Sequence, residues 1–228
     1  RRVLVTHIES PVGRRLAKAL FHDPDVALVV GVGSEAEPTF LAPYRGKIAY
    51  QRLDLAKARH LQSFLHSERF ARARVDSVIH LPFAIEQPGE RVPGGLPSLV
   101  SETGNVNLVS ESQLLGFDGE GDLDVRAWID ADLICQGELH GSALRTTILR
   151  AATIVTETGE FLNSPPLQPG PAPVGYDPML SVVSERDVAR ALVLALHADR
   201  AGIYNIASHE IFPRSQLRES VRRLGPIA

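Results

Sequence analysis

Cysteine, aromatic residues and long apolar runs are all scarce in this sequence. The single cysteine, Cys135, excludes a disulfide within these residues and is typical of a protein in a reducing cytoplasm. No apolar stretch approaches the roughly 20 residues that a membrane-spanning helix needs. The formal net charge of -3 gives no electrostatic reason to expect a nucleic acid or an anionic membrane as a partner. We therefore expect a cytoplasmic protein with neither of these partners.

The chain is long enough for one sizeable α/β domain. Its 228 residues are 44% apolar and 22% charged, which are ordinary values for a globular protein. Apolar runs of strand type alternate with helical patterns, which favours a doubly wound, parallel α/β sheet. We expect one domain over residues 1–228. The strands expected in the one sheet are Val3–Val5, Val26–Val32, Ile48–Leu53, Val78–Leu81 and Thr146–Leu149.

The rest of the chain is organised around its N-terminal run. Val3–Val5 reads as a buried strand, Thr6–Gly13 as a turn and Arg14–Leu20 as an amphipathic helix. In such a unit the helix N-terminus points its free N–H groups and its positive dipole end at a pyrophosphate. Glycines in the turn let the backbone come close to that group. The run therefore predicts a nucleotide-binding unit.

This run resembles the opening of the extended short-chain dehydrogenase/reductase family, also called NAD-dependent epimerases/dehydratases. The turn of that family usually reads T-G-x-x-G-x-x-G. Thr6 and Gly13 match it, whereas His7 and Ser10 stand where the first two glycines belong. Two interpretations stay open: a damaged phosphate loop, or a turn that packs helix on strand and binds nothing.

Further matches to the family follow in the right order along the chain. Val75–Ala84 resembles its fourth strand, V-D-x-V-I-H-L-A, with Pro82 in place of the alanine. Leu144–Ala151 resembles its T-I-L-R-P strand, and Gly202–Ala207 its late Y-N-I strand. Gly175–Ala191 resembles the strand and D-V-A helix that close the substrate lobe. The resemblance thus spans nearly the whole chain, and it implies a Rossmann-type, doubly wound parallel sheet with a small C-terminal lobe whose elements lie over about 151–228.

The ribose side of the expected cofactor site departs from the family pattern. A dinucleotide site usually has an acidic residue after the second strand, yet Gly33 stands there. Glu35 or Glu37 either reaches round to replace it or is a solvated loop charge, and we favour the second. Asp54 resembles an adenine-side contact or acts as the N-cap of the next helix. The residues that the resemblance places around the cofactor are Thr6, Ser10, Pro11, Val12, Gly13, Gly33, Ser34, Asp54, Leu55, Leu81, Pro82 and Phe83.

The catalytic pair of the family, Tyr-x-x-x-Lys, is missing. In that pair the lysine lowers the pKa of the tyrosine, which then serves as acid or base. Counting back from the Thr147–Arg150 strand places Trp128 near the tyrosine position and Asp132 near the lysine position. We expect no metal site, because no histidine pair has zinc spacing with a third partner. Tyr44, Tyr50, Tyr176 and Tyr204 are followed four residues later by Ile48, Asp54, Leu180 and Ser208.

The fifth strand of the family, which ends in a catalytic serine or threonine, is also not visible. Residues 116–122 offer only turn residues and acids. Either the chain has lost this strand, or a segment is missing from the chain as printed. We favour the second, because deleting an inner strand exposes two sheet edges.

The resemblance implies NAD or NADP as cofactor, a small-molecule substrate such as a nucleotide-sugar, and a homodimer as a possible assembly. With its loop changed and its catalytic pair missing, we expect a weak or non-catalytic binding module. NAD(H) should then bind in the high micromolar range, on the order of 10⁻⁴ M, or weaker. The alternative is an active oxidoreductase or nucleotide-sugar epimerase/dehydratase whose catalytic strand is missing from the printed chain.

Overall fold

The computed structural model describes residues 1–81, 123–162 and 177–224, except residues 37, 56, 142, 144, 160, 178 and 199. Residue contacts divide the chain into two compact units. The first comprises Arg1–Ile85 and Glu185–Ala198, and the second Glu86–Ser184 and Asp199–Ala228. The helix Glu185–His197 (α5) therefore belongs with the N-terminal residues, although it lies far along the chain.

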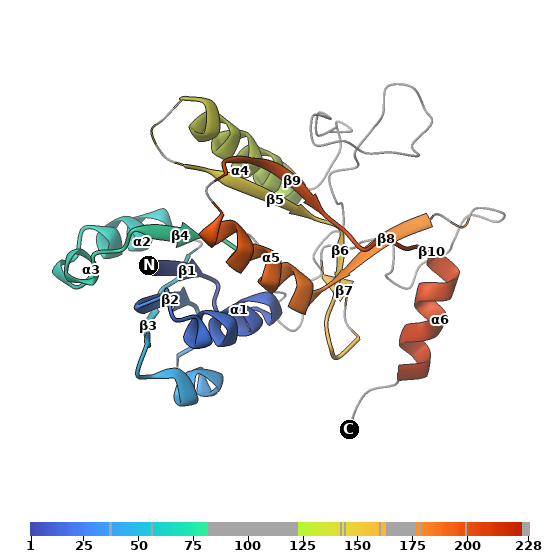
Figure 1. The fold of residues 1–228 in the computed structure, drawn as a ribbon, viewed down its shortest axis with the longest axis horizontal. Helices are drawn as coiled ribbons and strands as arrows, with labels where there is room; N and C mark the ends of the chain where they lie inside the picture. The colour runs from blue at the N-terminus through green and yellow to red at the C-terminus, as the bar shows by residue number, and fades with distance from the viewer. Residues whose placement is uncertain are drawn as a thin grey trace. The chain divides into compact units, whose positions relative to one another are not determined.

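The first unit contains a four-stranded sheet in which every neighbouring pair is parallel, in the order β3-β2-β1-β4 (Figure 1). Dinucleotide-binding α/β folds begin with this strand order. The prediction of parallel pairing among the first four strands is confirmed. The elements of this unit before α5 are β1 (Arg2–Thr6), α1 (Pro11–His22), β2 (Leu28–Gly33), η1 (Thr39–Tyr44), β3 (Ile48–Arg52), α2 (Ala58–Leu65), α3 (Glu68–Ala73) and β4 (Ser77–Ile79).

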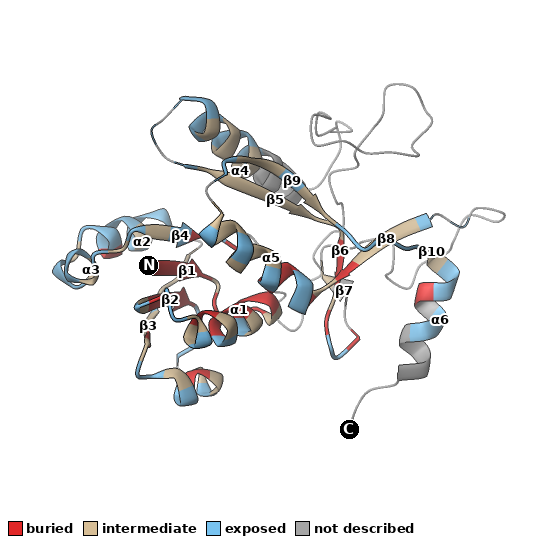
Figure 2. Ribbon diagram, viewed as in Figure 1, coloured by how far each residue is buried: buried red, intermediate tan, exposed pale blue. Residues whose placement is uncertain are grey.

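Apolar side chains cover both faces of this sheet, and the buried residues gather on β1, β2 and α1 (Figure 2). One face carries a cluster formed by Leu4, Val30, Val32 and Phe64, the last of these from α2. Because successive strand residues point to opposite faces, the fully buried Val3 and Val5 lie on the other side. Helix α1 packs along α5. The sheet is thus packed on both faces, and this packing holds the residues at the ends of its strands in place.

Helix α1 begins at Pro11, three residues before the predicted start at Arg14. Ser10 is its N-cap: the Ser10 Oγ accepts the Gly13 N–H at 3.0 Å. Proline fits the first helical position, where its missing N–H leaves no helical hydrogen bond unmade. Residues that the sequence analysis placed in the turn therefore belong to the helix.

The second unit contains two smaller sheets among the described residues. Strand β5 pairs in parallel with β9, and the other sheet has the order β10-β8-β6-β7. Among the described strands, β5 and β9 form a two-stranded sheet separate from the first four strands, so the expectation that Thr146–Leu149 joins that sheet is wrong. None of the helices in the described ranges is long and apolar enough to cross a membrane. The elements are α4 (Leu123–Gly141), β5 (Thr147–Ala151), β6 (Thr153–Val155), β7 (Phe161–Leu162), β8 (Met179–Ser184), β9 (Gly202–Ile206), β10 (Ile211–Pro213) and α6 (Arg214–Leu224).

Candidate functional site

The carboxyl ends of β1, β2 and β4 carry the first group of predicted site residues. Thr6 is the last residue of β1, Gly33 is the last of β2, and Leu81 follows β4. The Thr6 hydroxyl accepts the Leu81 N–H at 2.9 Å and lies 2.9 Å from His80 Nδ1. We assign the Thr6 proton to this second contact, which leaves His80 Nδ1 as an acceptor. The network fixes β4 against β1 at the edge where open α/β sheets bind ligands.

His7 stands where the resemblance expects the first glycine. Its φ of 47° lies in the left-handed region that glycine adopts without strain. The side chain is half-buried, and its Nδ1 has no hydrogen-bond partner among the described residues. Burial lowers the pKa of His7, against the charge of Glu9 and a backbone hydrogen bond at Leu81. His80 is exposed, yet desolvation and then the charge of His7 lower its pKa too.

The N-terminus of α1 keeps little capacity for binding an anion. Pro11 has no N–H, and the N–H of Gly13 is already donated to Ser10 Oγ at 3.0 Å. In the first three helical residues as the structure describes them, Val12 alone has an N–H left to donate. A phosphate at this helix would therefore meet fewer donors than a glycine-rich turn supplies.

The loop after β1 runs along the end of β2 and fills the space above two glycines. The Ile8 N–H donates to the Val32 carbonyl at 3.3 Å, which continues the pairing of β1 with β2. A Cβ on Gly31 would lie 2.6 Å from the Ile8 Cδ1. A Cβ on Gly33 would lie 1.7 Å from the Glu9 Oε2. The two glycines thus receive the side chains of two successive loop residues.

Glu9 brings a carboxylate to the end of β2. The residue is only 5% exposed. Its Oε1 accepts the Ser34 N–H at 2.6 Å and the Ser34 hydroxyl at 3.1 Å. Its Oε2 is buried and has no hydrogen-bond partner among the described residues. Because a buried carboxylate oxygen without a donor is unfavourable, this atom marks a place for a donor from outside those residues.

Exposed charges lie beside this carboxylate. The side chain of Glu35 is 44% exposed and 3.4 Å from Arg14 Nη2, as expected of a solvated loop charge. The Glu35 carbonyl accepts the Tyr50 hydroxyl at 2.8 Å, and Arg52 Nε donates to the carbonyl of Ser34 at 3.2 Å. Burial, followed by the charges of Glu9 and Glu35, raises the pKa of Tyr50. Tyr50 therefore stays protonated and is no base. Glu37 lies outside the described residues.

The other residues predicted for the cofactor site are Asp54, Leu55, Pro82 and Phe83. Asp54 Oδ2 is 3.0 Å from Lys57 Nζ. Lys57 is itself the N-cap of α2 and has no side-chain cap, so the N-cap role predicted for Asp54 is wrong. Leu55 packs against the apolar cluster of the sheet. Pro82 and Phe83 lie outside the described residues.

In the second unit, Asp132 on α4 is bound by an arginine. Arg150 Nε donates to Asp132 Oδ2 and Nη2 to Oδ1, both at 2.9 Å, and Gln136 adds a third bond at 2.6 Å. Burial alone would raise the pKa of Asp132, but these bonds and the charge of Arg150 hold it below the ordinary value. Burial and then nearby carboxylates raise the pKa of Cys135, which makes it a poor nucleophile. Neither side chain is arranged for acid or base work.

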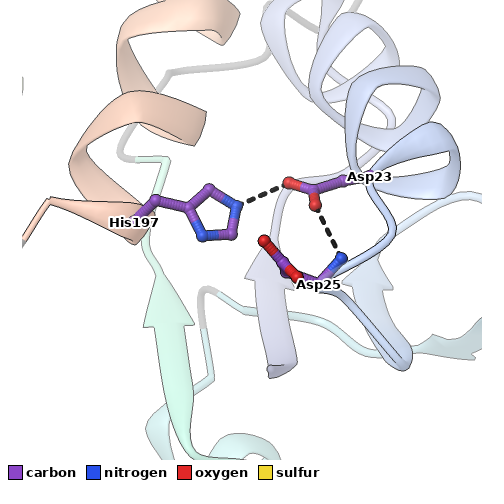
Figure 3. Close-up of side chains that lie close together, drawn as sticks. All are labelled: Asp23, Asp25 and His197. Carbon is purple, nitrogen blue, oxygen red and sulfur yellow. Dashed lines mark hydrogen bonds and ion pairs between the residues drawn. The ribbon is translucent and has the colours of Figure 1, made fainter.

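One cluster in the first unit has the composition of a metal site. Ligand atoms of Asp23, Asp25 and His197 lie within 4.8 Å of one another (Figure 3). His197 Nε2 is 2.6 Å from Asp23 Oδ2, and the Asp25 N–H donates to Asp23 Oδ1 at 3.0 Å. Burial would raise the pKa of Asp23, but the hydrogen bonds from His197 and Asp25 and the charges of His197 and Lys47 hold it low. A cation would have to break the hydrogen bond between His197 Nε2 and Asp23 Oδ2, so we interpret the cluster as a hydrogen-bonded pair that joins the ends of α1 and α5.

The parallel sheet in the order 3-2-1-4, with its first strand, loop and helix, defines the class: a Rossmann-type, doubly wound α/β fold. No protein-family model matches the chain, and no curated protein matches its sequence. Solved structures do match its fold.

A UDP-glucuronic acid 4-epimerase variant from Bacillus cereus, in complex with a UDP-sugar and NAD, aligns with 98% of this chain and 80% of its own, at 16% identity and a TM-score of 0.65. A dTDP-glucose 4,6-dehydratase from Bacillus anthracis in complex with NAD aligns with 97% and 80%, at 12% identity and a TM-score of 0.65. L-Threonine dehydrogenase from Clostridium difficile aligns with 98% and 80%, at 12% identity and a TM-score of 0.66. The chain has the fold of these enzymes, which is the fold of the family that its motifs resemble.

Glu9 is not among the site residues predicted from the sequence, because its position is a variable one inside the loop motif of the family. A signal was present in the second strand, where Gly31 and Gly33 lie two apart and therefore on one face. Glycine inside a strand indicates close approach of another group, here the loop residues Ile8 and Glu9.

Proposed function

We propose that this chain binds an NAD-type dinucleotide and does not perform the tyrosine-based reaction of the epimerases and dehydratases. The observation that carries the proposal is the β1–loop–α1 unit at the carboxyl edge of the parallel sheet. Ligands of open α/β sheets bind at this edge. Two of the structures with this fold named above hold NAD, which supports the cofactor class. A nucleotide-sugar is the substrate class that this fold favours, since one of them also holds a UDP-sugar.

The residues expected at the adenosine ribose suit such a ligand better than the residues expected at the pyrophosphate. The buried, unpartnered Oε2 of Glu9 suits a hydroxyl donor. The capped N-terminus of α1 and the side chain of His7 leave less for a diphosphate than glycines would. Binding should therefore be weak, on the order of 10⁻⁴ M or weaker.

The absence of hydride chemistry is argued from the sequence and from α4. No tyrosine of the chain has a lysine four residues later. Asp132, near the expected lysine position, accepts two bonds from Arg150 and cannot lower the pKa of a tyrosine. The binding module is thus the function that these residues support best.

One observation favours a second candidate function. The protein would be an active oxidoreductase, and the printed sequence would omit the segment that carries its catalytic strand. Among the described strands, the first sheet ends at β4, and β5 pairs with β9 in a sheet of its own. The family's fifth strand has no counterpart among the described strands between β4 and β5 in chain order. The intact mass or the coding sequence across residues 115–124 separates the two candidates.

The proposal is tested with the purified chain. NAD and NADP are titrated by calorimetry, and hydride transfer is followed at the absorbance of the reduced nicotinamide with a panel of UDP- and dTDP-sugars. We expect binding near 10⁻⁴ M, as an order of magnitude, and no rate above background. Dissociation constants in the low micromolar range would contradict the weak-binding part. Hydride transfer abolished by changing a residue of α4 would show that another proton donor has been recruited.

A further inference from the structure

We infer that Glu9 is the residue that binds the adenosine ribose in this chain and that it selects a free 2′-hydroxyl over a 2′-phosphate. The inference rests on the proposed function. It adds a specificity-determining residue to the site and chooses NAD over NADP, which the sequence with Gly33 leaves open.

The position of the carboxylate is the first argument. Dinucleotide sites take their ribose acid from the end of the second strand, about 20 residues after the glycine loop. Gly33 holds that place and has no side chain to offer. A Cβ built on Gly33 would lie 1.7 Å from Glu9 Oε2 and 2.5 Å from Oε1. The carboxylate of Glu9 therefore occupies the volume in which an acidic side chain at position 33 would begin.

The hydrogen bonds of the carboxylate are the second argument. Ser34 gives both its N–H and its hydroxyl to Oε1, at 2.6 and 3.1 Å, which fixes the orientation of the group. Oε2 is left buried with no donor among the described residues. The ribose diol supplies O–H donors of the kind that this oxygen lacks, and bonds to a charged acceptor are the stronger class. One oxygen is thus used for positioning and the other is left for the ligand.

The charges beside the site decide between a hydroxyl and a phosphate. Arg14 and Arg52 are the residues that would suggest a 2′-phosphate, since arginine commonly binds that group. Arg14, however, lies 3.4 Å from the carboxylate of Glu35, and Arg52 Nε donates to the carbonyl of Ser34. A 2′-phosphate would bring nearly two negative charges against the buried Glu9, and like charges at close range are strongly unfavourable. The site therefore favours the unphosphorylated ribose.

The experiment uses ADP-ribose and 2′-phospho-ADP-ribose, which lack nicotinamide, so that binding is read without any reaction. Dissociation constants are measured by ligand-observed NMR up to millimolar ligand on the full chain. For the wild type we expect ADP-ribose to bind at least about tenfold more tightly than its 2′-phosphorylated form. Glu9→Gln keeps the shape and removes the charge. This variant should bind ADP-ribose about tenfold more weakly than the wild type. Its dissociation constants for ADP-ribose and 2′-phospho-ADP-ribose should become nearly equal.

Two further variants sharpen the test. Glu35→Gln removes an exposed acid at the same edge and should change the dissociation constant of ADP-ribose by less than about twofold, as expected for an exposed surface charge. Because it also releases Arg14, it serves as a control for ADP-ribose alone. Glu9→Ser combined with Gly33→Asp moves the carboxylate from the loop to the strand end and should restore the wild-type preference. If this double variant does not fold, as judged by circular dichroism, the comparison of Glu9→Gln with Glu35→Gln decides alone.

Each remaining outcome overturns a defined statement. ADP-ribose that binds Glu9→Gln as tightly as the wild type, or more tightly, shows that the carboxylate is neutral to the ligand or blocks it; the inference fails, while the binding itself supports the proposed function. A wild type that binds both ligands equally also contradicts the inference, while its binding supports the proposed function. Failure of the wild type and of every folded variant to bind either ligand overturns the proposed function, and the role of Glu9 with it.

Discussion

Replacing Asp132 with asparagine should destabilise the second unit by about 2–3 kcal/mol. The side chains of Asp132 and Arg150 are 13% and 14% exposed and share two hydrogen bonds of 2.9 Å. Breaking a fully buried pair costs about 3–5 kcal/mol, and the residual exposure of this one reduces that figure. Asparagine keeps one acceptor but turns an amide N–H₂ toward the guanidinium. For a chain of this size the loss corresponds to a decrease in Tm of roughly 4–12 °C.

The assay is urea unfolding followed by the fluorescence of Trp128, the single tryptophan, which lies one helical turn before Asp132 on α4. Asp130→Asn is the matched control, because Asp130 is exposed on the same helix and should change the free energy of unfolding by less than about 0.5 kcal/mol. The pKa of Asp132 is lowered in the folded state, so its contribution is complete above the ordinary aspartate pKa and is lost as the pH falls below it. The free energies of unfolding of the wild type and of Asp132→Asn should therefore become equal at acidic pH. Equal stability of wild type and Asp132→Asn at pH 7 would refute the reasoning.

Three other perturbations have defined outcomes. Gly13→Ala places a Cβ 2.6 Å from two backbone carbonyl oxygens and should cost about 1–3 kcal/mol in urea unfolding; a variant as stable as the wild type contradicts that packing. The folded-state pKa values of His7 and His80 are lowered, so Tm should fall as the pH drops below about 6.5, because the unfolded chain binds more protons; His80→Gln should flatten this slope. His197→Ala removes a part-exposed pair with Asp23 and should cost less than about 1 kcal/mol, and millimolar Zn²⁺ or Mg²⁺ should leave the Tm of the wild type unchanged.

Much of the first unit could be predicted because its signals are local. Continuous apolar runs such as Val26–Val32 identify strands buried on both faces, and the helices between them require parallel neighbours. The start of α1 was placed too late, because Ser10 was compared with a missing glycine. Its ordinary role as an N-cap, followed by Pro11, was present in the same residues.

The errors concern partners that are distant in the sequence. A strand pattern at Thr147–Ala151 predicts a strand but does not identify its neighbour, and the neighbour is β9. The same limit explains why Glu9 was missed. Its role depends on Gly33 and Ser34, more than 20 residues away, and no pattern within the loop encodes that contact. That a side chain from the loop fills the space beside a glycine of a strand can be recognised only when the two elements are placed side by side in the structure.

The contact between Glu9 and Gly33 also restricts how such a site can evolve. Any side chain at position 33 displaces the Glu9 carboxylate from its place against Ser34, since the first added atom would lie 1.7 Å from Oε2. Two acids cannot share this space, so a lineage that carries its acid on the strand can move it to the loop only after the strand position has become glycine. A comparison that scores each position alone records a lost acid at 33 and an unremarkable glutamate at 9. Positions 9 and 33 therefore have to be compared as a pair, because the Glu9 carboxylate fills the space in which a side chain at position 33 would begin.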